Sequence, residues 1–276
     1  MRSIRLIALD LDGTLLDNYK ELPDENKKAL KYAASKGVHI TVCSGRYYNG
    51  VRCIADEIGV DVAIVAGNGA EVRRMNGDLV FGKYLELPVC KHLVNIACEY
   101  KLVFNVYAHD TIITFCENDV TLYYERLNKR LTPENQCRVL YINDIMEFVE
   151  LPPSALKTGV LKLEYRNINK DISEELKEII HKTPGIAIEG SFERSVELHA
   201  TNVSKGTGLQ IVAWDAGIEM ANVMAFGDYI NDIHMLKVSG FPVAMGNADS
   251  ITKATASYIT ASNVECGVAK AIYEFI

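Results

Sequence analysis

Short apolar runs alternate with helical patterns at both ends of this chain. At the N-terminal end the runs IRLIALD, HITVC and DVAIVA are separated by helical patterns over residues 23–36 and 47–58. Such alternation is typical of βαβ units, which build a parallel sheet. The same rhythm returns from about residue 204, where NVMAFG, FPVAM and SYIT alternate with further helical patterns. The two ends are therefore predicted to build one α/β domain around a doubly wound parallel sheet.

The middle of the chain follows a different pattern. KLVFNVY and TIITFC succeed each other across a short connection, and KTGVLKLEY precedes a charged helical pattern near residues 169–182. Strands in such close succession favour antiparallel pairing. We therefore expect residues 84–190 to form an inserted α/β domain with an antiparallel sheet, while residues 1–83 and 191–276 form the first domain. Both domains would be of ordinary size.

Charge and cysteine content limit the partners and the compartment. The 276 residues include 29 Lys and Arg against 36 Asp and Glu, a formal net charge of −7, and the basic residues are scattered along the chain. Nucleic acid and anionic membranes are therefore not expected partners. The seven cysteines form no CxxC pair and mostly lie in apolar segments, which is typical of reduced thiols in a cytosolic protein. No apolar run is long enough for a membrane span, so we expect a cytoplasmic location.

The first apolar run ends in two acids, Asp10 and Asp12. Side chains alternate along a strand, so the two carboxylates would point to the same side, about 6–7 Å apart. Gly13 permits a sharp turn, after which the backbone amides could form an anion-binding nest. An anion beside two acids requires a cation between them. The alternative is that these residues simply end a strand and begin a loop.

A hydroxyl and a lysine occur at two further strand and helix ends. Ser44 and Gly45 directly follow the run HITVC, a place where a hydroxyl and free amides bind phosphate oxygens. Lys205 falls in the first turn of a helix that Ser204 would cap, where the helix dipole disfavours a cation. A bound phosphate would remove that penalty. The alternatives are a turn or cap residue at position 44 and a solvated lysine, which would cost only about a few tenths of a kcal/mol.

A second acidic pair follows the later run NVMAFG. Asp228 comes directly after this run, and parallel sheets bind ligands at the carboxyl ends of their strands. Asp232 lies four residues further, on the same face if a helix begins here. Taken alone, Asn231 and Asp232 are ordinary helix starters. Each of the four features could occur by chance, but chance explains their joint occurrence at strand and helix ends less well. We therefore predict one site for a phosphate and a cation.

The four segments resemble the four motifs of the haloacid dehalogenase superfamily. DLDGT at 10–14, Ser44, Lys205 and GDYIND at 227–232 match these motifs in order. SGRYY, NGA and SKGTGL, with the long insert between the second and third motifs, are similar to the Cof-type phosphatases, which carry a class IIB cap. The resemblance implies a Rossmann-like catalytic core formed by both ends of the chain, with the insert as a cap that sets substrate specificity. Tyr229 departs from the smaller polar residue common at its position.

The resemblance also implies roles for individual residues. Asp10 would be the nucleophile, and Asp12 the acid/base that protonates the leaving alcohol and later activates water. Mg²⁺ would be held by Asp10, the main-chain carbonyl of Asp12 and Asp228, in the oxygen shell that this ion prefers. The residues implied to bind the phosphoryl group are Leu11, Ser44, Gly45, Lys205 and Asn231. Asp232 and Thr14 would support these ligands, and the candidate substrate contacts are Arg46, Asn68 and Glu197.

The predicted function is hydrolysis of small phosphorylated metabolites through an aspartyl phosphate. A kinase or NTPase would carry GxxxxGK[ST] and a dinucleotide oxidoreductase GxGxxG, and neither string stands at the required place. A phosphomutase of the same superfamily and a catalytically silent metabolite-binding regulator stay open as alternatives. Hexose phosphates, FMN and pyridoxal phosphate are all compatible substrates, and the pattern specifies no oligomeric state.

Overall fold

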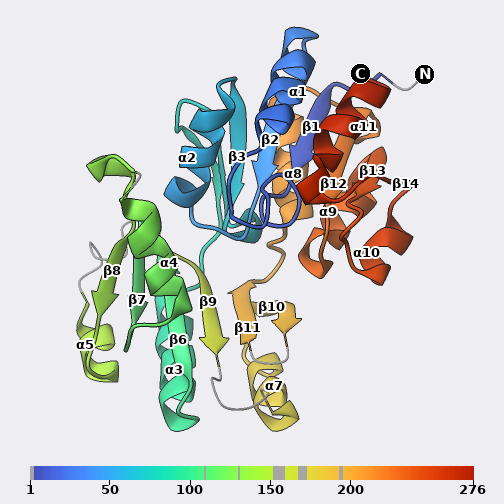
Figure 1. The fold of residues 1–276 in the computed structure, drawn as a ribbon. Helices are drawn as coiled ribbons and strands as arrows, with labels where there is room; N and C mark the ends of the chain where they lie inside the picture. Colours follow the sequence, from blue (N-terminus) through green and yellow to red (C-terminus); the bar gives the residue numbers. More distant parts are fainter. Residues whose placement is uncertain (1–2, 109, 130, 152–158, 167–172, 193–194) are drawn as a thin grey trace. The chain divides into compact units, whose positions relative to one another are not determined.

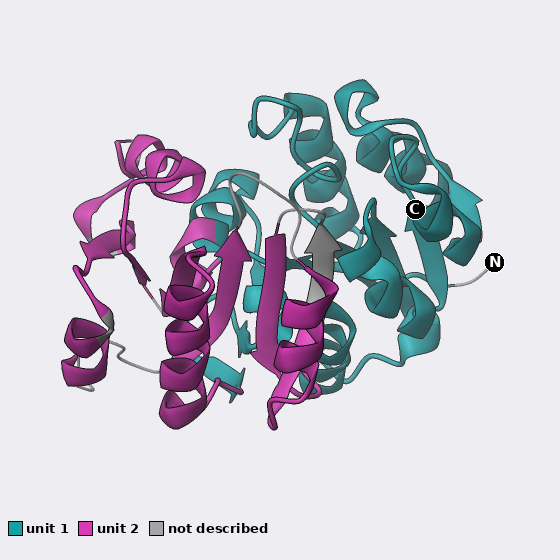
Figure 2. Ribbon diagram, turned by 90° about the horizontal axis from the view of Figure 1, so that it is seen from below, with its two compact units in different colours: residues 1–46, 51–82, 204–276 teal, residues 47–50, 83–203 magenta. Residues whose placement is uncertain are grey.

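The computed structural model describes residues 3–276 except 109, 130, 152–158, 167–172 and 193–194. The chain divides into two compact units, which Figure 2 colours separately. Each unit is built around its own sheet. Unit 1 contains Met1–Arg46, Val51–Gly82 and Ser204–Ile276, and unit 2 contains Tyr47–Gly50 and Lys83–Val203.

An eight-stranded sheet forms the centre of unit 1, in the order β14-β13-β12-β1-β2-β3-β4-β5 (Figure 1). The strands from β14 to β3 run parallel, and β4 and β5 are antiparallel to their neighbours. β1 is fully buried in the middle, as its apolar sequence LIAL predicts for an interior parallel strand. The strands are β1 (Leu6–Leu9), β2 (His39–Cys43), β3 (Val62–Ala66), β4 (Glu71–Arg73), β5 (Leu79–Gly82), β12 (Val223–Gly227), β13 (Phe241–Ala244) and β14 (Tyr258–Ile259).

Helices pack on this sheet and on one another. α1 packs against α11, while α8 packs against α9 and against β2 and β3 (Figure 1). Leu6, Val65, Leu209 and Val223 belong to the buried apolar cluster that includes residues of α8 and of the sheet. This layering confirms the predicted doubly wound α/β core. The helices are α1 (Asp24–Ser35), α2 (Tyr48–Ile58), α8 (Lys205–Asp215), α9 (Ile233–Val238), α10 (Ser250–Thr255) and α11 (Gly267–Phe275).

A six-stranded sheet forms the centre of unit 2, in the order β10-β11-β9-β6-β7-β8. All neighbours are antiparallel except β7 and β8, which confirms the predicted sheet of mainly antiparallel strands. α3 packs against β6 and β9, and α7 packs against β10 (Figure 1). The elements are β6 (Val103–Ala108), β7 (Thr111–Thr114), β8 (Arg138–Tyr141), β9 (Val160–Arg166), β10 (Ile186–Phe192), β11 (Ser195–Ala200), α3 (Leu87–Glu99), α4 (Asp119–Asn128), α5 (Ile145–Glu150) and α7 (Glu174–His181).

The return of the chain from unit 2 to unit 1 lies later than the expected position, residue 191. That residue falls inside β10, which pairs with β11, and β11 pairs in turn with β9. These pairings hold the chain in unit 2 as far as Ala200, and unit 2 ends at Val203. The pairing of β11 with β9 joins segments about 30 residues apart in sequence, which a local pattern does not reveal. The Tyr47–Gly50 segment also belongs to unit 2.

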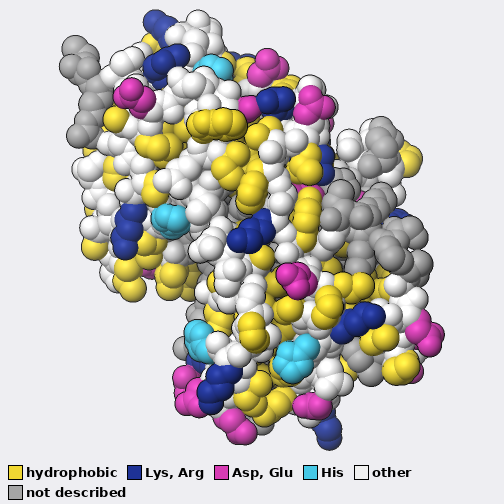
Figure 3. Space-filling model, turned by 180° about the vertical axis from the view of Figure 1, so that it is seen from behind, with side chains coloured by type: hydrophobic (Ala, Val, Ile, Leu, Met, Phe, Trp, Pro, Cys, Tyr) yellow, Lys and Arg dark blue, Asp and Glu magenta, His cyan; other side chains and the backbone are white. Residues whose placement is uncertain are grey.

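Charged side chains of both signs are mixed on one face of the molecule. On the face drawn in Figure 3, Lys and Arg side chains lie among acidic, apolar and uncharged ones. Within the described part of the chain, the helices are too short or too polar to cross a membrane.

Candidate active site

Two acids meet at the carboxyl edge of the unit 1 sheet. Asp10 follows β1 and Asp228 follows β12, and these strands are parallel neighbours with Leu9 opposite Phe226. The chain proceeds from β1 to β2 on one side and reaches β12 on the other, so the two acids lie at the point where the strand order reverses. Open α/β sheets bind their ligands at such a point. The pairing of β1 with β12 thus brings both acids to one edge of the sheet, where the sequence predicts them.

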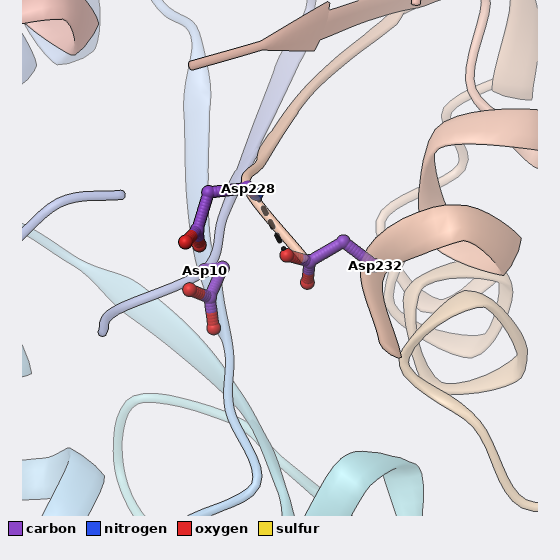
Figure 4. A group of neighbouring side chains, drawn as sticks. All are labelled: Asp10, Asp228 and Asp232. Carbon is purple, nitrogen blue, oxygen red and sulfur yellow. Dashed lines mark hydrogen bonds between the residues drawn. The ribbon is translucent and has the colours of Figure 1, made fainter. Parts of the chain in front are cut away.

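A third acid completes the group. One carboxylate oxygen each from Asp10, Asp228 and Asp232 lies within 4.8 Å of the others. Figure 4 shows the three side chains. Asp232 comes from a short 3-10 turn, Ile230–Asp232, and α9 begins directly after it, at Ile233. Its Oδ2 accepts the amides of Asp228 at 2.9 Å and Tyr229 at 3.2 Å. These bonds hold the third carboxylate in place.

The ammonium of Lys205 joins two of these acids. Its Nζ donates to Oδ1 of Asp10 and to Oδ1 of Asp232, both at 2.7 Å, and all three side chains are buried. Burial alone would lower the pKa of Lys205, but the two carboxylates outweigh it and hold that pKa above its usual value. The lysine at the start of α8 therefore has two carboxylate partners, which offset its unfavourable position without the phosphate that the sequence suggested.

The group carries more negative than positive charge. Burial raises the pKa of Asp10 well above its usual value, although the Lys205 ammonium opposes this shift. Burial and the nearby Asp232 raise the pKa of Asp228 to about 6. Hard carboxylate oxygens at this spacing are the donors that Mg²⁺ prefers, and a divalent cation would relieve their repulsion. The residues present therefore fit a magnesium ion.

The turn after Asp10 approaches the group closely. Thr14 donates through Oγ1 to Oδ1 of Asp228 at 2.9 Å. Gly13 has a φ of +91°, and a Cβ there would overlap the Asp228 carboxylate. The glycine of the DLDGT segment is thus required by the close approach of Asp228 as well as by the turn itself.

Asp12 is held by two cations. Arg46 donates through Nε to Oδ2 at 2.8 Å and through Nη2 to Oδ1 at 2.7 Å, and Nζ of Lys20 lies 2.8 Å from Oδ1. Burial would raise the pKa of Asp12, but Arg46 and Lys20 hold it well below its usual range. The strand ends at Leu9, so strand alternation does not extend to Asp12 and its carboxylate lies outside the group of three acids. Lys20, in a left-handed backbone conformation, was missed by the sequence analysis.

The remaining predicted phosphate-binding residues lie in neighbouring loops. Oγ of Ser44 accepts the amide of Arg46 at 3.2 Å, and the amide of Ser44 donates to the carbonyl of Val65 on β3. A Cβ on Gly45 would lie 2.9 Å from Oδ1 of Asn68. The side-chain nitrogen Nδ2 of Asn231 lies 3.5 Å from Oδ1 of Asn68.

Leu11 and Asn68 occupy turns of these loops. The carbonyl of Leu11 accepts the amides of Thr14 and Leu16, which closes the turn after β1. Asn68 is fully buried in a left-handed conformation, with φ of 54°. Its amide donates to the carbonyl of Ser44, so the loops after β2 and β3 are tied together.

Glu197 belongs to unit 2, on β11. Its Oε1 accepts from Nζ of Lys162 at 2.6 Å, and Nε2 of His199 lies 3.7 Å from Oε2. Burial would raise the pKa of Glu197, but Lys162 and His199 hold it well below its usual range. The structure thus places this candidate substrate contact in an ion-paired group of the second unit.

An acidic edge at the switch point of a doubly wound sheet, with a buried lysine on it, places the chain among the α/β proteins that bind a ligand at the carboxyl ends of their strands. The chain belongs to the haloacid dehalogenase-like hydrolases, since the model of this family matches residues 7–272. The resemblance inferred from the motifs is thereby confirmed.

Two similar proteins are named phosphatases, and each matches this chain over nearly its whole length. The chain is 32% identical over 273 residues to 5-amino-6-(5-phospho-D-ribitylamino)uracil phosphatase YcsE of Bacillus subtilis (strain 168), covering 99% of this chain and 96% of that protein. It is 27% identical over 277 residues to pyridoxal phosphate phosphatase YbhA of Escherichia coli (strain K12), covering 99% and 98%. The chain is an enzyme of the phosphatase class within this family.

A solved structure supports the fold. The HAD subclass IIB sugar phosphatase BT4131 superposes with a TM-score of 0.78 at 23% identity, covering 98% of each chain. That likeness bears on architecture alone, and it agrees with the Cof-type, class IIB assignment.

Proposed function

We propose that this chain is a Mg²⁺-dependent phosphatase that hydrolyses small phosphorylated metabolites, either sugar phosphates or phosphorylated cofactors, through an aspartyl phosphate on Asp10. The observation that carries the proposal is the contact between Asp10 and Lys205, 2.7 Å apart, inside a group of three carboxylates. A nucleophilic carboxylate, an ammonium for the phosphoryl charge and donors for a cation are the parts that this chemistry needs.

Asp10, Asp228 and the main-chain carbonyl of Asp12 would hold the Mg²⁺, and Asp232 would support it. When bound, this ion supplies the positive charge that lets an anionic carboxylate approach an anionic ester. Thr14 holds Asp228 through its hydroxyl, and two backbone amides hold Asp232. These contacts fix the acids before any ligand arrives, which reduces the reorganisation that the reaction requires.

In the first step an oxygen of Asp10 bonds to phosphorus while the bond from phosphorus to the leaving oxygen breaks. Asp12 gives a proton to that oxygen, so the product leaves as a neutral alcohol. In the second step Asp12 takes a proton from water, whose oxygen attacks phosphorus and releases Asp10 and inorganic phosphate. Arg46 and Lys20 keep Asp12 ionised here, which suits the second step. The first step requires Asp12 to separate from these cations and take up a proton.

The other predicted residues complete the proposal. Lys205, Ser44, Gly45, Asn231 and the Leu11 amide would surround the phosphoryl oxygens. All of these residues lie in unit 1. The proposed catalytic core is residues 1–83 and 191–276, of which unit 1 contains all but residues 47–50, 83 and 191–203. Unit 2 is proposed as the cap that selects the substrate. Arg46, Asn68 and Glu197 are proposed as substrate contacts.

The names of the relatives support the substrate class. One is a phosphatase for a phosphoribitylamino uracil and another for pyridoxal phosphate. Both named substrates are phosphate monoesters of small polar molecules, and we extend that class to this chain. A screen of sugar phosphates and phosphorylated cofactors, with phosphate release as the readout, would identify the preferred ester.

Replacement of the nucleophile tests the reaction. Asp10→Asn should lower the rate of phosphate release with Mg²⁺ by at least roughly 1,000-fold, because an amide cannot form the covalent intermediate. Asp24→Asn, an exposed acid at the start of α1, is the matched control and should keep full activity. Undiminished turnover in Asp10→Asn would refute the mechanism. Isomerised sugar phosphate without free phosphate would identify a phosphomutase instead.

A further inference from the structure

The residues on both sides of Lys205 contact one side chain, the imidazole of His234. Oγ of Ser204 lies 2.5 Å from Nδ1 of His234. Gly206 packs so closely on His234 that a Cβ at this position would lie 2.7 Å from Cγ of the ring. Real Cβ atoms do not approach neighbouring atoms at that distance, so Gly206 is needed for the close packing. The backbone of Lys205 is therefore bracketed by two contacts to the same residue.

The hydroxyl of Ser204 links His234 to the first turn of α8. Oγ of Ser204 accepts the amide of Thr207 at 3.1 Å and also shares a hydrogen bond with Nδ1 of His234. A hydroxyl both donates and accepts, so this bond can form with either neutral tautomer of the imidazole. Because Ser204 is also the N-cap of α8, this bond fixes the first turn of the helix that carries Lys205.

The ammonium of Lys205 is tied to the same short segment. Nζ bonds Asp232, and His234 lies two residues further along, in the first turn of α9. Gly69 supports Ser204 from another loop, because a Cβ on Gly69 would overlap the carbonyl oxygen of Ser204. Gly69 has φ of +105°, a conformation that favours glycine. The position of the Lys205 Nζ, beside Asp10, thus depends on contacts made by the backbone around Lys205.

We propose that His234 is a positioning residue that holds the first turn of α8 where Lys205 can reach both Asp10 and the transferring phosphoryl group. This inference rests on the proposed function, in which Lys205 stabilises the charge of that group. Displacement of a catalytic group by about 1 Å can cost roughly 100-fold in rate. Because the contact of Lys205 strengthens in the transition state, its displacement lowers kcat more than it changes KM.

The test compares steady-state hydrolysis of p-nitrophenyl phosphate with Mg²⁺ by the wild type, His234→Leu, His234→Asn and Lys237→Ala. Leucine keeps much of the volume without a hydrogen-bonding group, asparagine keeps a side chain that can hydrogen-bond, and Lys237 is another exposed residue of α9. We expect kcat to fall about 10- to 100-fold in His234→Leu and less than about threefold in His234→Asn, with KM within about threefold in both. Lys237→Ala should match the wild type.

Two results would overturn the proposal. One is a His234→Leu enzyme with kcat within about twofold of the wild type, and the other is an equal loss in the Leu and Asn variants, which would indicate packing alone. If His234→Leu does not fold, His234→Ala is judged by the same criteria. An inactive wild-type enzyme would refute the proposed function itself. An active wild type with an unaffected His234→Leu variant would refute the positioning role and leave the proposed function intact.

Discussion

Both units bury charged side chains, but the two groups balance their charges differently. In unit 1 the carboxylates of Asp10, Asp228 and Asp232 lie together, and Lys205 bonds two of them. The acids exceed the ammonium in number, and the pKa values of Asp10 and Asp228 are raised, chiefly by burial. Without a further cation, the crowded acids of this group therefore destabilise the folded state.

In the unit 2 group, made up of Lys162, Glu164, Arg166 and Glu197, each carboxylate has a cationic partner. Lys162 donates to Glu197 at 2.6 Å, and Arg166 donates through Nε to Glu164 at 2.6 Å. The side chains lie on β9 and β11, neighbouring strands of the sheet. Although burial opposes it, the pKa of Glu197 is held well below its usual range, chiefly by Lys162. The charges of this group are thus compensated by partners within the same sheet.

The difference indicates that the unit 1 group, and not the unit 2 group, is the one that a bound cation would stabilise. A buried carboxylate with its own cation gains nothing from an added metal ion, whereas crowded carboxylates lose their repulsion when one binds. Functional sites commonly keep such unfavourable arrangements at the expense of stability. The comparison therefore predicts opposite effects on stability when one acid is neutralised in each group.

The largest effect is expected on activity, from the lysine of the unit 1 group. Lys205→Met should lower kcat for phosphate release roughly 1,000-fold, because it removes a fixed charge from the phosphoryl site. Lys28→Met, an exposed lysine of α1, serves as the control and should behave as the wild type. A Lys205→Met enzyme within about tenfold of the wild type would show that the ammonium balances the acids only structurally.

The next effect concerns the paired group. Glu197→Gln should lower the free energy of unfolding by about 3 kcal/mol, because Lys162 would be left buried without its charge partner. Urea unfolding measures this value, with Glu125→Gln, an exposed residue of α4, as the control that should change it by less than about 0.5 kcal/mol. Equal stability of the two variants would mean that the pair contributes nothing.

The smallest effect has the opposite sign. In the absence of Mg²⁺, Asp228→Asn should raise the free energy of unfolding by about 1–2 kcal/mol at neutral pH, since the amide removes one charge from the crowded acids. The same substitution should abolish phosphatase activity. Urea unfolding in EDTA, with Asp24→Asn as the control, measures the difference. A less stable Asp228→Asn protein would contradict the idea that these acids repel one another.

The pH dependence of this gain sharpens the test. The carboxyl of Asp228 is protonated in the folded and unfolded states well below pH 3.8 and ionised in both well above about pH 6. Between these values the folded wild type binds more protons, so its stability falls as pH rises. The advantage of Asp228→Asn should therefore grow from about pH 4 to about pH 6 and then level off. A constant difference across this window would exclude Asp228 as its source.

The sequence predicted those parts of the site that depend on where strands end. Asp10 and Asp228 could be placed together because each follows an apolar run, and parallel strands end at one edge of the sheet. Lys205 was noticeable for its unfavourable place at a helix start. Its partners Asp10 and Asp232 are 195 and 27 residues away, so the carboxylates that offset its position could not be read from the local pattern.

Loops and long-range pairing limited the rest. Alternation stops with β1 at Leu9, so the direction of Asp12 depends on its contacts with Arg46 and Lys20. Lys20 reaches Asp12 from a turn whose closure depends on bonds made by Asp17, and no motif marks that turn. Likewise, β4 and β5 pair as a short antiparallel hairpin beside the parallel strands, an addition that the βαβ rhythm did not indicate.

Trapping the covalent intermediate tests the central claim most directly. A single turnover with a phosphate monoester would be quenched in acid, and the peptides analysed by mass spectrometry. The account predicts a phosphoryl group on Asp10 when Mg²⁺ is present, and none in EDTA or in Asp10→Asn. Release of phosphate by the wild type with no modification of Asp10 at any time during the turnover would contradict it.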